Sequence, residues 1–336
     1  MKFDLSRLRW GPSRPDVVDG RGQTFFAGPV VTIATDGQTP RAGELLHALP
    51  MVKVEGAAAN SSGRLAVLVK RAGGPFAAAG WYASTTVLPV LPASPSAEIE
   101  VLLARVGYRL QTLVIDDRAT PDGTAHREAY WKVLTAAYAV LRELNTAIAR
   151  GDGLESPVPR IVGLKKLSST SGRTVALSSP TANLEPYVRR ALGAVTPNDC
   201  GPGGGPDCLI GNARMLRRLM ATSAGQSGSS GWREDPVSGQ RVFCYMGIPF
   251  YRADVEVETT GNPNTSRLYA ANLGPTGLNL VHAHGTPGSF GLEADDISNT
   301  AGVGATGRVV HGAYALALWE SEALFEVSNI DVGGDP

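Results

Sequence analysis

The sequence predicts an α+β fold from the distribution of its apolar residues. One stretch of about 27 residues, 124–150, repeats its apolar positions at the spacing of a helix. Most other apolar runs are short and rich in β-branched residues, as strands are, and they do not alternate regularly with helices. Glycine and proline, 40 and 23 of the 336 residues, supply the turns between these runs.

Composition and charge exclude several classes of protein. Lysine plus arginine and aspartate plus glutamate both number 31, so the formal net charge is zero, whereas a dedicated nucleic-acid binder carries a basic excess. Only 18% of the residues are charged, against about 25% in a typical globular domain. A neutral chain of this length suits a subunit that packs against copies of itself better than a mutually repelling monomer.

The cysteines and the apolar runs predict the compartment. Three cysteines, Cys200, Cys208 and Cys244, form no even disulfide framework, which indicates a reducing environment. No apolar stretch reaches the roughly 18 residues of a membrane span, and the first residues lack the apolar core of a secretory signal. We therefore expect a cytoplasmic chain that has no membrane contact.

Residues 1–50 are polar, punctuated by proline and glycine, and only weakly periodic. They predict an extended arm with little core of its own, containing one strand at Pro29–Thr35 and a short helix at Arg41–Leu49. An arm that cannot bury itself usually lies on another surface.

Residues 51–120 are rich in predicted strands. These are Met51–Glu55, Arg64–Lys70, Tyr82–Leu91, Glu98–Leu103 and Gly107–Ile115. Long strands with mixed polar faces, joined through small residues such as Ala72–Gly80, predict a projecting hairpin. Such a hairpin exposes sheet edges, which promote aggregation unless a partner covers them.

Residues 124–150 predict a long amphipathic helix that ends at Arg150 and Gly151, a cation followed by a glycine. At about 1.5 Å per residue this helix is about 40 Å long, enough to span a domain as a spine. The apolar side chains expected in its core are Tyr130, Leu134, Tyr138, Leu141, Leu144 and Ile148.

The rest of the chain predicts a mixed region and then strands. Residues 151–178 predict a turn and an apolar strand region, and two short helices follow at Asn183–Leu192 and Asn212–Ala221. The later strands are expected within Arg241–Glu258, Ser266–Leu273, Gly277–Ala283, Gly307–Ala317 and Leu324–Asp331.

No constellation in the sequence combines a nucleophile, a base and oxyanion donors. His282 and His284 would point to one face of a strand and could bind a metal, with Glu293, Asp295 or Asp296 nearby. A solvated polar strand face is the simpler interpretation of this pair.

Two further patterns are equally weak. Asp116 and Asp117 follow an apolar strand, where α/β enzymes place carboxylates, but a polar strand cap explains them as well. The GPGGGP run at 201–206 lacks the Gly-Lys-Ser/Thr ending of a phosphate loop. We therefore expect no enzyme, no catalytic residue, no cofactor and no metal. A cytoplasmic metal-dependent enzyme that uses His282 and His284 is the alternative of another class.

The serial order of features is more informative than any motif. An arm, a long hairpin and a long helix that ends in a Gly-Asp-Gly turn come first. The segments that carry this order are Ala147–Leu164, Cys208–Met220, the Gly-x-Pro strand pair Met246–Phe250, Arg267–Val281 and Gly307–Ile330. Over residues 25–331 the chain resembles the major capsid protein of tailed bacteriophages, which has the Hong Kong 97 fold.

The resemblance implies a division of the chain. The parts are an N-terminal arm at 1–50, an extended hairpin loop at 51–97, a peripheral domain at 98–178 with the spine helix 124–150, an axial domain at 179–306, and a return to the peripheral domain at 307–336. Arg64, Lys70, Trp81 and Tyr82 belong to the hairpin loop, and we expect them to act in assembly.

The resemblance also implies function and partners. The chain would form pentamers and hexamers of an icosahedral shell around the double-stranded DNA of a tailed bacteriophage, assembled in the bacterial cytoplasm and located in the virion. A separate scaffolding protein and a portal are expected partners, a decoration protein is a further candidate, and DNA would be contacted without sequence specificity. An encapsulin-type nanocompartment shares the fold and is the nearest alternative.

Overall fold

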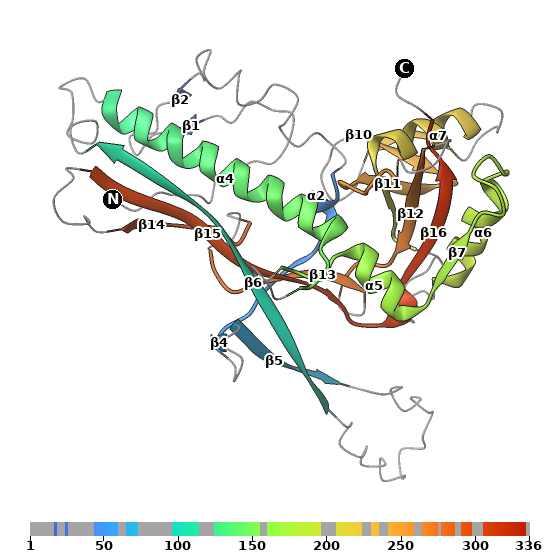
Figure 1. The fold of residues 1–336 in the computed structure, drawn as a ribbon, viewed down its shortest axis with the longest axis horizontal. Coiled ribbons are helices and arrows are strands. Elements are labelled where there is room, and N and C mark those ends of the chain that lie inside the picture. The colour runs from blue at the N-terminus through green and yellow to red at the C-terminus, as the bar shows by residue number, and fades with distance from the viewer. Residues whose placement is uncertain are drawn as a thin grey trace, which may run out of the picture.

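Two sheets and one long helix dominate the protein. The computed structural model describes residues 17–18, 24–25, 44–59, 65–72, 96–113, 124–154, 160–195, 206–223, 230–234, 241–258, 264–274, 277–285, 290–297 and 305–333. Within this part, the helix α4 (Thr124–Arg150) lies across one seven-stranded sheet, and a second seven-stranded sheet stands beyond its C-terminal end (Figure 1). The α+β class predicted from the sequence is confirmed.

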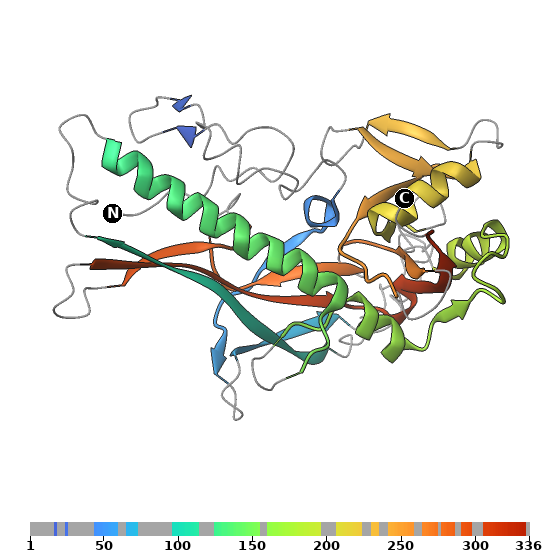
Figure 2. The same ribbon diagram turned by 45° about the horizontal axis from the view of Figure 1, so that its top comes forward.

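The first sheet carries α4 on one face. Its strands in spatial order are β3 (Met51–Lys53), β13 (Leu278–His282), β15 (Ala305–Leu318), β6 (Ser96–Leu113), β5 (Leu65–Ala72) and β4 (Ala58–Ala59), and β14 (Glu293–Ile297) pairs with β15. β6 and β15 run antiparallel, with Ala104–Leu113 against Ala305–Tyr314. The view in Figure 2 shows α4 lying along these two long strands.

The second sheet is built mostly from the later part of the chain. Its order is β7 (Thr174–Ala176), β16 (Leu324–Asp331), β12 (Thr265–Ala271), β8 (Cys208–Gly211), β11 (Ile248–Arg252), β10 (Arg241–Tyr245) and β9 (Gly231–Glu234). The remaining elements are β1 (Val17–Val18), β2 (Thr24–Phe25), α2 (Leu45–Ala48), α5 (Leu164–Ser171), α6 (Glu185–Ala194), α7 (Ala213–Ser223) and the short 3-10 helix η1 (Ser321–Ala323).

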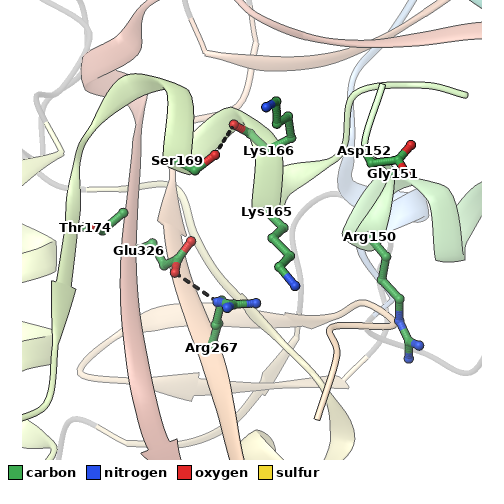
Figure 3. A pocket seen from close by; sticks show the side chains of 9 residues that line it. All are labelled: Arg150, Gly151, Asp152, Lys165, Lys166, Ser169, Thr174, Arg267 and Glu326. Carbon is green, nitrogen blue, oxygen red and sulfur yellow. Dashed lines mark hydrogen bonds and ion pairs between the residues drawn. The ribbon is translucent and has the colours of Figure 1, made fainter. Parts of the chain in front are cut away.

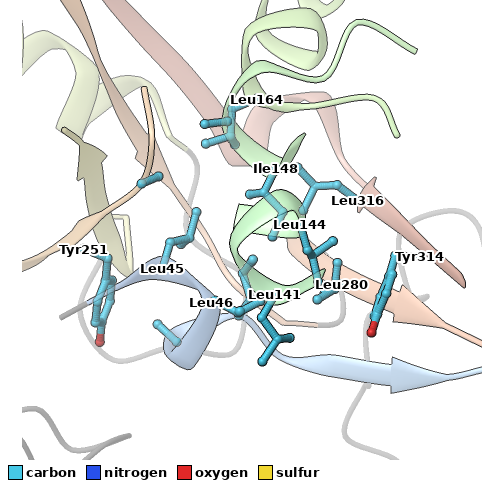
Figure 4. Close-up of a cluster of buried hydrophobic side chains, with 14 of the residues drawn as sticks. Leu45, Leu46, Leu141, Leu144, Ile148, Leu164, Tyr251, Leu280, Tyr314 and Leu316 are labelled. Carbon is cyan, nitrogen blue, oxygen red and sulfur yellow. The ribbon is translucent and has the colours of Figure 1, made fainter. Parts of the chain in front are cut away.

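The apolar stripe of α4 forms the centre of the main core, as predicted. Leu141, Leu144 and Ile148 are fully buried, and Tyr138 packs against the same cluster from a half-buried position. Figure 4 shows Leu141, Leu144 and Ile148 beside Leu280 and Leu316 of the first sheet, and Tyr251 of the second sheet beside Leu45 of α2. The backbones of Tyr130 and Leu134 lie in α4, but their side chains lie outside the described residues.

A second core fills the other side of the second sheet. The inward faces of α6 and α7 pack there, for example Val188 and Leu219 against Phe250 and Val327. Because the sheet's other face contributes Tyr251 and Leu324 to the α4 cluster, strands β11 and β16 of the second sheet are buried on both faces.

Local chemistry explains several element boundaries. The Asn212 side chain accepts a hydrogen bond from the Met215 amide at 2.8 Å and so caps the start of α7. Between β10 and β11, Met246 and Gly247 both have positive φ, 52° and 84°, as a two-residue hairpin turn with the twist of its strands requires.

Two expectations about elements are wrong, and one about the arm is confirmed. The predicted break between two strands at 104–106 does not exist, because β6 is continuous and simply changes its partner from β5 to β15 there. The strand region expected in 151–178 contains a helix, α5, whose Leu164 and Ser168 are buried at helical spacing. In the arm, the helix predicted at Arg41–Leu49 is present as α2, and its Leu45 and Leu46 lie in the main core of the subunit.

The predicted domain boundary between residues 306 and 307 does not separate the two sheets. β13 and β14, expected in the axial domain, lie in the sheet under α4, and β16, expected to return to the peripheral domain, lies in the second sheet. The chain therefore crosses between the sheets at Leu273–Leu278 and again in η1. None of the described helices is both long enough and apolar enough to span a bilayer.

Candidate functional site: the hairpin and the junction between the sheets

The first candidate site is the ribbon formed by β5 and the first half of β6. Antiparallel pairing runs from Leu65 opposite Leu103 to Ala72 opposite Ser96, and the ribbon projects from the body of the subunit (Figure 1). Its base is anchored, because Val67 and Leu103 join a small core with strands β13 and β15. Farther along the ribbon the Leu68 side chain is 65% exposed.

The predicted assembly residues lie on or beyond this ribbon. Lys70 is in β5, in register with Glu98, although its side chain is outside the described residues. Arg64, Trp81 and Tyr82 lie outside the described part of the chain, so their role in assembly stays a prediction.

The second candidate site is the junction where α4 and α5 meet the second sheet. A cavity of about 630 Å³ opens here, and Figure 3 shows Lys165 and Arg267 directed into it. The extended segment 253–258 supplies the opposing charges: Asp254, Glu256 and Glu258 alternate along it with the buried Val255.

Each of these carboxylates meets a cation from another element. The Arg150 guanidinium, at the end of α4, pairs with the Asp254 carboxylate and donates from Nε to the Asp254 carbonyl at 2.6 Å. Lys165 Nζ lies 2.7 Å from Glu256 Oε2, and Arg267 pairs with Glu258. Three of the four cations that line the cavity are therefore neutralised, so the cavity is a structural junction and carries little surplus charge for an anion.

The junction gives a prediction for pH. The hydrogen bond from the Lys165 ammonium is the main cause that holds the pKa of Glu256 below its ordinary value, and the charges of Arg150 and Arg267 add to it. A carboxyl group that is more acidic in the folded state adds stability above its unfolded pKa, near 4.5, and this stability is lost as the pH falls through the folded value.

We expect Glu256→Gln to lower the free energy of unfolding by at most about 1 kcal/mol at pH 7, because both partners are almost half exposed. The difference from the unsubstituted protein should shrink as the pH falls below 4.5 and disappear once the carboxylate is protonated in the folded state as well. Urea unfolding at pH 7 and at a series of lower pH values measures it. Glu234→Gln, on an exposed strand end, is the matched control and should leave the stability unchanged at every pH.

The histidine pair does not lie as predicted. β13 ends at His282, which is buried, and His282 Nδ1 lies 2.7 Å from the carbonyl oxygen of His284 beyond the strand. The two rings are therefore not side by side on one strand face. Burial is the main cause that lowers the pKa of His282, so the ring is kept neutral.

Of the predicted acidic neighbours, Glu293 approaches His284, as the sequence suggested, whereas Asp295 pairs with His311, which the prediction did not include. His284 Nδ1 lies 3.4 Å from Glu293, and His311 Nε2 lies 2.8 Å from Asp295. Among the residues that the structure describes, no three histidine, cysteine or carboxylate side chains are arranged to hold a metal ion.

Other sequence candidates contribute no site. Asp116, Asp117, Cys200 and most of the 201–206 run lie outside the described residues. Cys208 is a free thiol, and burial raises its pKa far above the ordinary value, so it is unreactive. The junction itself was missed, although the alternating charges of Asp254, Glu256 and Glu258 were visible in the sequence.

Comparison with known proteins supports a fold and no sequence family. No family model matches the chain, and no curated protein matches it in sequence. The SrpI encapsulin of Synechococcus elongatus matches in structure with a TM-score of 0.59 at 14% identity, over 87% of this chain and 89% of that one.

Two capsids are also similar at lower scores. The capsid of the empty GTA particle has a TM-score of 0.48 at 13% identity, over 86% of this chain and 96% of that one. The protein of Mycobacterium phage Bobi has a TM-score of 0.47 at 13% identity, over 92% of this chain and 96% of that one.

The likeness to the encapsulin extends over most of both chains. This chain therefore has the Hong Kong 97-like capsid fold, as the order of its sequence features predicted.

Proposed function

We propose that this chain is the major capsid protein of a tailed bacteriophage and that its copies assemble into an icosahedral shell around double-stranded DNA. The projecting β5–β6 ribbon carries the proposal. A two-stranded ribbon is at best marginally stable alone in water. In this one Leu68 is exposed, and within the described part of the chain only Leu65 and Ala66 of β5 pair with a further strand, β4. Burial of the ribbon against another subunit would cover both Leu68 and the unpaired strand edges.

The wider proposal follows from assembly by symmetry. Several contacts per subunit convert modest pairwise affinities into a stable closed container. We propose pentamers and hexamers of this chain, a separate scaffolding protein, a portal, a decoration protein as a further partner, and DNA held without sequence specificity. The subunit would assemble in the bacterial cytoplasm, reside in the virion and act without enzymatic activity.

An encapsulin-type nanocompartment is the second candidate, and one observation favours it. The TM-score of 0.59 was found for an encapsulin, whereas the two capsids described above scored 0.48 and 0.47. The two candidates share a subunit fold and differ in the contents of the shell.

The test of the proposal shortens the hairpin without changing its paired residues. Ala72 and Ser96 are partners in register, so Asn-Gly can replace residues 73–95 and close a two-residue hairpin. We expect this variant to keep the melting temperature of the full chain and to form no closed particles in negative-stain microscopy. Closed particles from it would contradict the proposal.

The chain offers a matched control for this experiment. Glu234 and Arg241 are also partners in register, so Asn-Gly can replace residues 235–240 in the same way between β9 and β10. This control is expected to form particles like those of the full chain.

The contents of the particles separate the two candidates. Particles from cells that express the chain with its genomic neighbours are treated with nuclease, and their contents are then extracted. Long protected double-stranded DNA would support the capsid, and an enclosed protein would support the encapsulin.

A further inference from the structure

The helices α6 and α7 carry a surplus of positive charge. Together they contain five arginines and a single acidic residue, Glu185, whereas the formal net charge of the whole chain is zero. Three of the arginines lie in α7, which contains no acidic residue. The charge of this neutral chain is therefore distributed unevenly, and the two helices are a cationic region.

The two helices form one layer on the second sheet. α6 contacts β12 and β16, and α7 contacts β10, β11 and β12, so both cover the same face. They lie at the opposite end of the subunit from the first turn of α4 (Figure 1). Val188 and Ala191 of α6 and Met215 and Leu219 of α7 are buried against the sheet. Because the apolar sides of both helices face the sheet, their polar sides form the outer surface of the layer.

Three arginines are exposed on this outer surface. Arg190 and Arg217 are exposed, and neither forms an ion pair with a residue that the structure describes. Arg189 is 66% exposed and pairs with Glu185, one helical turn away. Exposed ion pairs of this kind contribute little stability, so Arg189 can turn to another anion at little cost. The α6–α7 layer therefore offers several cations to an anionic partner.

The outer surface suits a polyanion better than another protein. Among the described side chains of α6 and α7, Met220 is the only large apolar one that is exposed, at 37%. A stable protein interface needs a desolvated centre with large anchoring side chains. Binding to a nucleic-acid backbone needs cations that reach phosphates, and it tolerates a polar, hydrated surface. The α6–α7 layer meets the second set of requirements.

We propose that the α6–α7 layer binds the phosphate backbone of double-stranded DNA inside the shell, without sequence specificity. The proposal rests on the proposed function, which supplies the DNA, and adds the surface of the subunit that faces it. Each guanidinium that reaches a phosphate releases condensed counterions, so the binding weakens as the salt concentration rises. A few cations per subunit suffice, because many identical layers would face the same DNA molecule.

Photo-crosslinking in DNA-filled particles tests where the DNA lies. Gly193 is exposed in α6, and a Cβ there would meet nothing within 4 Å, so p-benzoylphenylalanine can replace it. Particles from cells that express the variant with the genomic neighbours of the chain are treated with nuclease and illuminated. We expect protein that stays attached to DNA under denaturing conditions. The same replacement at Leu68 of the projecting ribbon is the control, and it should crosslink to protein and not to DNA.

Every other result at position 193 overturns the proposal. Crosslinks to protein alone would mean that the layer is an interface between chains, and absence of crosslinks would mean that the layer faces away from the DNA. DNA-filled particles form in both cases, so the proposed function would survive. Failure of the unsubstituted chain to give DNA-filled particles would instead refute the function itself.

The salt dependence of DNA binding provides a second measurement. Binding of a short labelled duplex is followed by fluorescence anisotropy, with the full chain below the concentration at which it assembles. We expect Arg190→Gln with Arg217→Gln to lower the slope of log K against log salt by about two, close to 0.9 for each lost phosphate contact. Arg105→Gln with Arg109→Gln, on exposed arginines of the first sheet, is the matched control and should leave the slope unchanged. Equal slopes for the two variants would contradict the proposal.

Discussion

Gly151→Ala is expected to lower the free energy of unfolding by about 3 kcal/mol or more, because the added methyl group would overlap fixed backbone atoms. A Cβ at Gly151 would lie 2.3 Å from the Ile161 carbonyl oxygen and 2.6 Å from that of Ala147. Neither atom belongs to a flexible side chain, so the end of α4 or the returning loop would have to move.

The cost is large because the backbone at Gly151 packs directly against the backbone at Gly163. A Cβ on Gly163 would lie 2.6 Å from the Gly151 amide nitrogen, and the Gly163 amide donates to the Gly151 carbonyl at 2.8 Å. This contact sets where α5 begins, and through Lys165 it places the ion pair with Glu256. We therefore expect Gly151→Ala to loosen the junction as well as the helix end.

Gly193→Ala is the matched control. Gly193 lies in α6, and a Cβ there would meet nothing within 4 Å. Alanine in a helix is more stable than glycine by about 0.5–1 kcal/mol, so this variant should be slightly stabilised. Urea unfolding is best measured in the variant with the shortened β5–β6 hairpin, because assembly would obscure a two-state transition. Equal stability of the two variants would contradict the close packing of the Gly151 and Gly163 backbones.

The sequence predicted those parts of the fold that depend on local patterns. The helix over 124–150 has the predicted bounds because its apolar period persists for many turns, and Leu141, Leu144 and Ile148 are buried for the same reason. The order of arm, hairpin, helix and strands was also sufficient to predict the capsid-type fold.

The parts that failed depend on distant partners. The α5 sequence Leu-Lys-Lys-Leu-Ser-Ser-Thr-Ser has a short and weak helical pattern, and its buried Ser168 is held by Glu326, 158 residues away. The same holds for the junction, where Lys165 and Glu256 are 91 residues apart. Alternating carboxylates were visible in the sequence, but nothing local indicates which cations they meet.

Arg267→Met is expected to lower the free energy of unfolding by about 3–5 kcal/mol, because it leaves a buried carboxylate without its cation. The Glu326 side chain is only 9% exposed in the interior of the second sheet, and its Oε1 lies 3.0 Å from Arg267 Nε (Figure 3). Methionine keeps much of the length of arginine and can pack on the same sheet face. The loss of stability therefore measures the effect of removing the positive charge.

A double variant separates the charge from the packing. Adding Glu326→Gln to Arg267→Met removes the stranded charge, so we expect it to recover most of the lost stability, with the coupling obtained from a double-mutant cycle. Arg189→Met is the control for an exposed pair: Arg189 and Glu185 lie one helical turn apart, the arginine is 66% exposed, and the loss should stay below about 0.5 kcal/mol. If Arg267→Met cost as little as Arg189→Met, the hydrogen bond from the Ser168 hydroxyl and water in the adjoining cavity would be enough to stabilise the Glu326 carboxylate without a cation, which would contradict the prediction.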